Sequence, residues 1–170
     1  EIIEKYNLKV NGIYLTHSHF DHFADTAKLK RHLKCQVFVH KADSKNILRP
    51  GSDGILDLLN VEPVKEYKCL TDGNIINIDQ FSFHVIHTPG HSPGSVCFYF
   101  EKEKILFSGD TLFKGTYGNI NLPSSNEGDM YRSLNRLILL PKDVVVYPGH
   151  MDETSIGSEI DWILKLVSEQ

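Results

Sequence analysis

The sequence predicts one α/β domain spanning residues 1–170. A chain of this length can bury a substantial apolar core as a single domain. Its first quarter alternates strand-like and helix-like segments, whereas its middle consists of short apolar strands separated by turns. No internal repeat, low-complexity tract or long Gly/Pro linker divides it. We therefore expect helices that flank a β-rich centre.

The first quarter of the chain predicts a β-α-β unit. The predicted elements are the end of a helix at 1–8, a buried strand at 10–16, a helix at 21–33, a strand at 36–40, a short helix near 42–48 and a loop at 49–54. A helix between two strands implies that the strands run parallel and are joined by a right-handed crossover.

The remainder of the chain predicts further strands followed by two helices. The expected elements are strands at 75–78, 81–86, 96–100 and 105–108, a charged hairpin tip at 101–104, a helix at 129–140, a strand at 144–147 and a helix at 161–167. Phe81, Phe83 and Val85 alternate in the second of these strands, which is typical of a strand with one buried face.

Composition excludes several classes of protein. The net charge is −4 and the basic residues are dispersed, so nucleic acid is not an expected partner. No segment approaches the roughly 20 apolar residues of a membrane span, and none has the charged-then-apolar pattern of a leader. The chain begins without Met, so an upstream segment could carry a targeting signal. Cys35, Cys69 and Cys97 are an odd number without CxxC spacing, which predicts reduced core residues and favours a cytoplasmic protein.

A dense group of metal-ligand residues follows the first predicted strand. His17, His19, Asp21 and His22 fall within six consecutive positions. Side chains alternate in an extended chain, so His17 and His19 point the same way and can bind one ion. Asp21 and His22 begin the predicted helix, where they can face a second ion. So many ligand types in one turn predict a metal site.

Three later turns each present one more ligand-type residue. His91, Asp110 and His150 each stand in a Gly- or Pro-containing turn after an apolar strand. Because sites in α/β proteins gather at strand ends, these turns are expected to converge on the first group. Each turn alone is an ordinary one, and the inference depends on finding them together.

The other histidines are predicted to lie outside the site. His32 lies on a polar helix face and His40 ends a strand, so both are expected at the surface. His84 and His87 flank the strand that leads to His91, and His87 is a candidate hydrogen-bond partner behind a ligand. Tyr117 is expected to be a packed loop aromatic.

At these residues the chain resembles the metallo-β-lactamase superfamily. The shared pattern is His17-x-His19-x-Asp21-His22, followed in order by His91, Asp110 and His150. Segments 88–95, 109–113 and 147–150 resemble the glyoxalase II (hydroxyacylglutathione hydrolase) branch, especially its short single-domain bacterial members.

This resemblance implies an αββα sandwich and two divalent metal ions. The first ion would take His17, His19 and His91, the second would take Asp21, His22 and His150, and Asp110 would bridge the two. Zinc is expected, with iron or manganese as alternatives, because His and Asp ligands suit all three. The two carboxylates, Asp21 and Asp110, are also the predicted catalytic residues.

Such a pair of ions predicts a hydrolase. Two divalent ions about 3.5–4 Å apart can share a water and lower its pKa toward about 7. We expect the bridging hydroxide to attack a small-molecule thioester of the hydroxyacylglutathione type, because a thiol can leave as a metal-bound thiolate. Superfamily members that cleave other esters, lactones, phosphodiesters or β-lactams are the alternatives.

A rival hypothesis is a non-catalytic or weakly metallated fragment. Superfamily members normally begin with a β-hairpin and a strand ahead of the helix with which this chain starts, so a domain without its N-terminal strands is expected. The strand at 10–16 would then have an unpaired edge that favours self-association. Asn119 and Asn121 also replace an Arg and an Asp that are usual in related short proteins.

Overall fold

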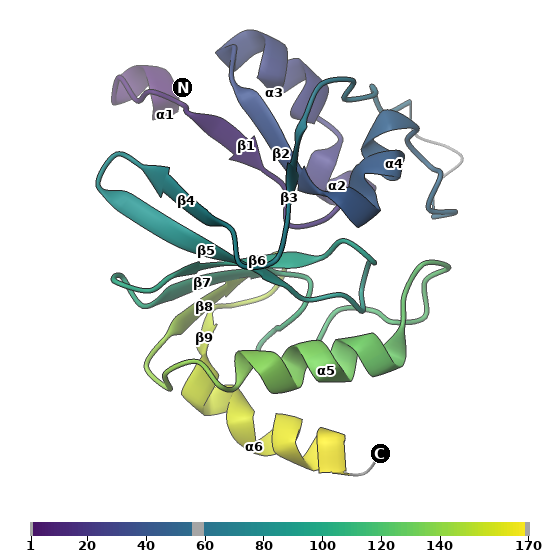
Figure 1. The fold of residues 1–170 in the computed structure, drawn as a ribbon, viewed down its shortest axis with the longest axis vertical. Helices are drawn as coiled ribbons and strands as arrows, with labels where there is room; N and C mark the ends of the chain where they lie inside the picture. Colours follow the sequence, from purple (N-terminus) through teal and green to yellow (C-terminus); the bar gives the residue numbers. More distant parts are fainter. Residues whose placement is uncertain (1, 56–59, 169–170) are drawn as a thin grey trace.

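The computed structural model describes residues 2–55 and 60–168, and these residues form four layers (Figure 1). Two β-sheets face one another, α2, α3 and α4 lie outside the smaller sheet, and α5 and α6 lie outside the larger sheet. The predicted αββα sandwich is therefore confirmed.

The smaller sheet has three parallel strands in the order β1-β2-β3, with β1 at Gly12–Tyr14, β2 at Gln36–His40 and β3 at Lys68–Leu70. Its helices are α1 at Ile2–Lys5, α2 at Phe20–Phe23, α3 at Thr26–Leu33 and α4 at Ser44–Leu48, with a 3-10 turn η1 at Lys41–Asp43. The parallel pairing of β1 with β2 confirms the predicted β-α-β unit.

The larger sheet has six strands in the order β4-β5-β6-β7-β8-β9. They are β4 at Ile75–Ile78, β5 at Phe81–His87, β6 at Val96–Phe100, β7 at Ile105–Gly109, β8 at Val145–Pro148 and β9 at Thr154–Ser155. All pairs are antiparallel except β7 with β8. Helices α5 at Glu127–Leu137 and α6 at Ile156–Ser168 complete the chain.

Three apolar clusters hold the layers together. Phe83, Val85, Val96 and Phe98 fill the space between the sheets, together with partly buried aromatic residues such as Tyr14. A second cluster packs the smaller sheet on its helices. The third joins the larger sheet to α5 and α6. The three clusters cover most of the apolar side chains of the sheets, although Phe107 and Tyr147 remain exposed, and this packing fixes the strand ends that carry the site residues.

Several predicted boundaries are wrong. The helix expected at 21–33 is two helices, because Asp25 stands between them at φ −91° and ψ 0°, outside helical geometry. Strand β3 was not predicted, since its three residues expose two side chains and carry no long apolar run. Strand β9 has only two residues. Helix α6 begins at Ile156, five residues before the expected start.

The cysteines are free, as predicted, but only one is a core residue. Cys97 is buried, whereas Cys35 is half-buried and Cys69 is exposed on the short strand β3. Cys69 alternates with the buried Leu70, so it faces away from the core. Among the described residues, no helix has the length and apolar character needed to cross a membrane.

Candidate metal centre

The predicted ligand residues meet at the carboxyl ends of four strands. His17 follows β1, His91 follows β5, Asp110 follows β7 and His150 follows β8. The first strand belongs to the smaller sheet and the other three to the larger sheet. The site therefore lies where loops from both sheets converge, as expected for α/β proteins.

The local backbone explains why four ligand-type residues fit in six positions. The chain remains extended through His19, whose φ of −70° and ψ of 149° place it as the N-cap of α2. Helix α2 then carries Asp21 and His22 in its single turn, while Phe23 is buried beneath. The change from strand to helix thus separates two pairs of side chains along one short segment.

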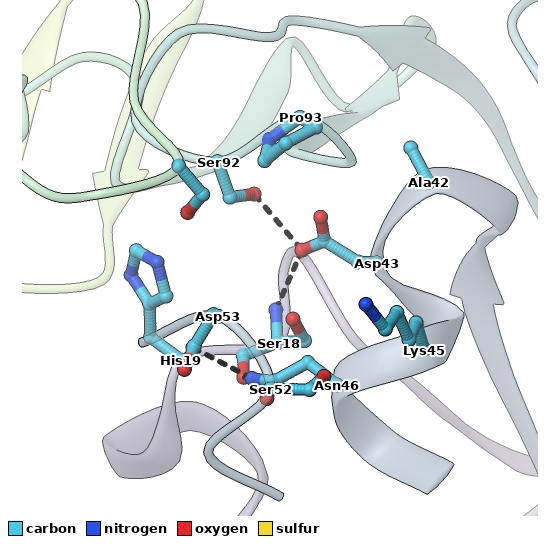
Figure 2. A pocket seen from close by; sticks show the side chains of 11 residues that line it. Ser18, His19, Ala42, Asp43, Lys45, Asn46, Ser52, Asp53, Ser92 and Pro93 are labelled. Carbon is cyan, nitrogen blue, oxygen red and sulfur yellow. Dashed lines mark hydrogen bonds between the residues drawn. The ribbon is translucent and has the colours of Figure 1, made fainter. Parts of the chain in front are cut away.

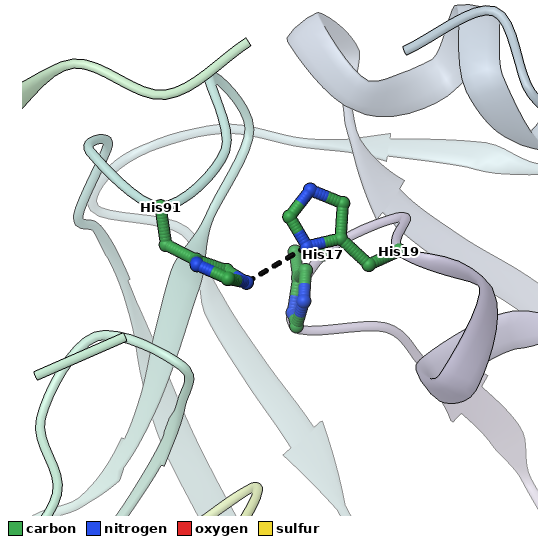
Figure 3. A group of neighbouring side chains, drawn as sticks. All are labelled: His17, His19 and His91. Atoms are coloured by element: carbon green, nitrogen blue, oxygen red, sulfur yellow. Dashed lines mark hydrogen bonds between the residues drawn. The ribbon is translucent and has the colours of Figure 1, made fainter. Parts of the chain in front are cut away.

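Three imidazoles form the first cluster. His17, His19 and His91 are almost fully buried, and each contributes a ring nitrogen to a group whose atoms all lie within 4.8 Å of one another. His19 Nδ1 lies 2.7 Å from His91 Nε2. Figure 3 shows the three rings pointing toward one another. The arrangement can hold one cation.

Hydrogen bonds orient two of these rings from behind. His91 Nδ1 lies 2.8 Å from the carbonyl oxygen of Asn119 and must donate to it, which leaves Nε2 as the electron-pair donor. His17 Nδ1 lies 3.2 Å from Thr16 Oγ1, and His17 Nε2 has no partner. Because Asn119 uses its backbone carbonyl, this contact does not depend on the identity of its side chain.

Asp21, His22 and His150 form a second, more open cluster. His150 Nε2 lies 3.1 Å from Asp21 Oδ2 and 3.3 Å from His22 Nε2. These three residues also offer ligand atoms within 4.8 Å of one another. The side chain of His150 is half exposed, so this cluster faces solvent.

Asp110 lies between the two clusters. Its Oδ2 is 3.4 Å from His91 Nε2 in the first cluster and 3.6 Å from His150 Nε2 in the second. Its Oδ1 is 3.3 Å from His22 Nε2 but has no well-oriented hydrogen-bond donor. One carboxylate therefore touches ligand-type residues of both clusters, as a bridging ligand would.

The electrostatics favour neutral imidazoles in the buried cluster. Burial lowers the pKa of His17 well below its ordinary value, and neighbouring imidazoles lower it further. Burial and then His91 lower the pKa of His19 to about 4. Burial also lowers the pKa of His91. Neutral imidazoles are the form that binds metal.

The pKa values of His22 and Asp110 shift toward the charged forms. Burial alone would lower the pKa of His22, but Asp110 and then Asp21 outweigh it and raise the pKa. Burial alone would raise the pKa of Asp110, but contact with His22 and His91 lowers it. Asp110 is thus held as an anion, which suits a bridge between two cations.

Two glycines make room for this arrangement. A Cβ on Gly149 would lie 2.3 Å from Asp110 Oδ1 and 2.7 Å from His22 Cε1. Gly109 has φ +50°, and a Cβ there would lie 2.7 Å from Thr16. A side chain at either position would displace a site loop, so the Gly-Asp and Gly-His pairs in the sequence serve close packing.

The residues present fit divalent metal ions. His17 Nε2, His19 Nε2 and Asp110 Oδ1 are buried without a hydrogen-bond partner. Buried polar atoms without partners are rare and need an explanation, and an ion within the cluster would supply one. The donors are imidazole nitrogens and carboxylate oxygens, which suit zinc, iron or manganese.

The remaining histidines lie outside both clusters. His32 is exposed, as predicted. The prediction for His40 is wrong: its ring is half-buried and stacks on His87 at 4.0 Å, because the ends of β2 and β5 lie close together. His84 lies 3.6 Å from Glu101, and His87 Nε2 contacts the carbonyl of Pro93 rather than a ligand.

Tyr117 is a packed loop aromatic, as predicted. Its ring makes an edge contact with Tyr131 and stacks on Trp162.

Sequence reasoning missed the polar residues that surround the first cluster. A cavity of about 160 Å³ borders His19 and is lined by Lys45, Asn46, Asp53 and several serines (Figure 2). Asp43 also lines it and is buried. The polar stretch at 43–46 could have suggested a role, but its contact with the ligand loops depends on long-range packing.

Comparison with known proteins finds relatives along most of the chain. Residues 3–150 match the family described as the Metallo-beta-lactamase superfamily. A protein of Aquifex aeolicus is 37% identical over 90% of this chain and 74% of its own length. Hydroxyacylglutathione hydrolase GloC of Haemophilus influenzae is 29% identical over 92% of this chain and 76% of its own length.

Solved structures share the fold of this chain. The crystal structure of BLEG-1 B3 metallo-beta-lactamase superposes with a TM-score of 0.87 and 34% identity, covering 94% of this chain and 78% of that chain. The di-iron-bound form of TTHA1623 gives a TM-score of 0.81 and 34% identity, with 94% and 79% of the two chains covered.

Proposed function

The chain belongs to the metallo-beta-lactamase superfamily, and from this membership and the site geometry we propose that it is a dinuclear metal hydrolase that cleaves thioesters. The proposed ligands are those of the two clusters, with His17, His19 and His91 for one ion and Asp21, His22 and His150 for the other. Asp110 is the proposed bridge.

The contact of Asp110 with both clusters is the observation that supports this proposal most strongly. Its two oxygens lie 3.3–3.6 Å from imidazole nitrogens of His22, His91 and His150. Bound ions would supply Lewis-acid activation of a water and of the substrate carbonyl. The protein contributes fixed donors, an anionic bridge and an exposed edge at His150 through which a substrate can approach.

Among the residues that the structure describes, no cysteine belongs to either cluster. Cys97 is the buried cysteine, and burial raises the pKa of its thiol to about 11, so it stays protonated near neutral pH. Nucleophilic cysteines instead have lowered pKa values and partial exposure. Hydrolysis by activated water is therefore the chemistry that fits these residues.

A thioester of the hydroxyacylglutathione type is the proposed substrate. The similarity to a hydroxyacylglutathione hydrolase supports this choice. The polar cavity beside His19 offers the Lys45 ammonium and serine hydroxyls to a polar substrate arm. Zinc is the proposed metal, although the similarity to a di-iron protein makes iron the alternative to test first.

The test is a substrate panel measured at defined metal content. The protein is loaded separately with zinc, iron or manganese, and the metal content is measured by elemental analysis. Hydrolysis is then followed for a hydroxyacylglutathione thioester, a lactone, a phosphodiester and a β-lactam. We expect the thioester to have the highest kcat/KM. A higher kcat/KM for another substrate, or no hydrolysis by protein with two ions bound, would contradict the proposal.

A further inference from the structure

A buried carboxylate outside the ligand set joins the two loops of the first cluster. Asp43 lies at the end of η1 and is only 3% exposed. Its Oδ2 accepts hydrogen bonds from Ser18 N at 2.8 Å and from Ser92 Oγ at 2.9 Å (Figure 2). Its Oδ1 accepts from Gly94 N at 2.6 Å. The three donors come from two loops far apart in the sequence.

The first of these loops carries His17 and His19. Ser18 stands between them, and Asp43 holds its N–H, which belongs to the peptide that follows His17. Asn46 Nδ2 donates to the carbonyl of Ser18 at 2.6 Å, which belongs to the peptide that precedes His19. Both peptides between the two ligand residues are therefore held by η1 and α4.

The second loop carries His91. Ser92 follows it directly, and the Ser92 hydroxyl that donates to Asp43 also contacts Ser95 Oγ at 2.8 Å. Gly94 approaches so closely that a Cβ there would lie 2.5 Å from Asp43 Cγ. The loop thus packs directly on the carboxylate, and its position follows that of Asp43.

We propose that Asp43 is a positioning residue that fixes His17, His19 and His91 relative to one another before metal binds. The proposal rests on the proposed function only in taking this cluster as a metal site. A carboxylate is an acceptor at both oxygens, so it can satisfy all three donors at once. Residues behind metal ligands orient them and tune affinity.

Glu159 provides a matched comparison. It is also 3% exposed, and it accepts hydrogen bonds from Gly115 N, Thr154 Oγ1 and Trp162 Nε1. Like Asp43, it is a buried carboxylate with three donors, but none of its partners is a proposed ligand or adjoins one. Comparing variants of Glu159 and Asp43 can thus separate the effect of losing any buried carboxylate from the effect of losing one that positions the ligands.

The experiment compares Asp43→Asn with Glu159→Gln. Each amide replaces one acceptor oxygen by a donor. In Asp43→Asn this leaves the N–H of Ser18 or of Gly94 facing another donor, whereas in Glu159→Gln the Thr154 hydroxyl can turn to accept from the new amide. Zinc affinities are measured by calorimetric titration of the metal-free protein, and folding by thermal melts. We expect Asp43→Asn to weaken one of the two zinc-binding events by about 10–100-fold. Glu159→Gln should leave both events unchanged, even where its melting temperature falls.

Assignment of the weakened event uses ligand variants. It should be the event that His19→Ala abolishes and not the one that His150→Ala abolishes. Ser92→Ala removes a single donor from Asp43 and should weaken the same event less, so it serves if Asp43→Asn does not fold. Unchanged affinity in Asp43→Asn and Ser92→Ala, or equal weakening in Glu159→Gln, would overturn the proposal.

The affinity measurement is independent of hydrolysis. Weakened zinc binding in Asp43→Asn together with an inactive wild-type protein would retain the positioning role and reject the proposed function. Active wild-type protein together with unchanged zinc binding in Asp43→Asn would retain the proposed function and reject the positioning role. A wild-type protein that binds none of zinc, iron and manganese would overturn both.

Discussion

The two clusters of the candidate centre differ in burial and in support. His17, His19 and His91 are buried, and hydrogen bonds with Thr16, Asp43, Asn46 and Asn119 hold their rings or the adjoining backbone. The side chains of Asp21 and His150 are 38% and 50% exposed, and they contact other members of the site and, for His150, the ring of Phe113. One cluster is preformed by its surroundings, whereas the other is open.

This difference suggests a division of roles. A preformed, buried set of neutral imidazoles loses little conformational entropy on binding an ion, so it should hold the ion more tightly. An open set leaves room for water and for the substrate carbonyl, as catalytic metal sites require. Asp110, which touches both, would transmit a change in either cluster to the other.

The largest expected effect follows from removing the residue that joins the clusters. Asp110→Ala deletes the bridge and leaves two cations without an anion between them, so thioester hydrolysis should fall about a thousandfold or more, which corresponds to about 4 kcal/mol of transition-state stabilisation. Steady-state kinetics at saturating metal measure this effect. If Asp110→Ala hydrolysed the thioester at the wild-type rate, hydrolysis would not need Asp110 as a bridge between the clusters.

A second pair of variants tests whether the clusters are unequal. His150→Ala should keep one tightly bound ion and lose the weaker one, because only the open cluster is damaged. His19→Ala should lose the tighter ion. Both should lower hydrolysis by more than the roughly 10–100-fold that a residue behind a ligand costs. Equilibrium dialysis against a chelator series gives the metal affinities. An equal loss of metal affinity in both variants would contradict a difference in affinity between the two clusters.

The stability of the metal-free protein should depend on pH in opposite directions for a histidine of the buried cluster and a histidine of the open cluster. The pKa of His19 is about 4 in the folded chain and 6.5 ordinarily, so the folded state binds fewer protons between these values. The contribution of His19 to the free energy of unfolding is therefore fully present above pH 6.5 and is lost as the pH falls toward 4.

Thermal melts of wild-type protein and His19→Gln at several pH values measure this contribution of His19 to stability. The melting temperature of the wild type should fall more steeply over this interval. For His22, whose pKa is raised, the sign is opposite: its contribution is present at low pH and is lost as the pH rises through the raised value. Parallel pH profiles for wild type and His19→Gln would show that the buried imidazole is not held neutral.

The smallest effect is expected outside both clusters. His32 is exposed on α3, so His32→Ala should change the free energy of unfolding by no more than about 0.5 kcal/mol and leave metal content unchanged. Chemical denaturation and elemental analysis provide the measurements. A loss of metal in this variant would mean that histidine content, and not the geometry of the clusters, governs binding.

The sequence predicted the parts of the site that depend on local pattern. Alternation along an extended segment places His17 beside His19, and turns after apolar strands place His91, Asp110 and His150 at one end of the sheets. These relations follow from backbone periodicity and strand direction, which a single sequence carries.

The residues that support the site could not be predicted in this way. Asp43 reaches Ser92, 49 positions away, and Asn119 offers only its backbone carbonyl to His91. Such contacts depend on how η1 and the loop before α5 pack, which no local spacing encodes. The breaks at Asp25 and the short strands β3 and β9 were missed for a related reason, since tertiary pairing outweighs their weak local pattern.

The position of bound metal tests the central claim most directly. Crystals of zinc-loaded protein, measured at an energy where zinc scatters anomalously, would locate each ion. Two peaks about 3.5–4 Å apart are predicted, one at the buried cluster and one at the open cluster, with Asp110 in contact with both. A single peak, or two peaks that do not share Asp110, would contradict a dinuclear centre joined by this carboxylate.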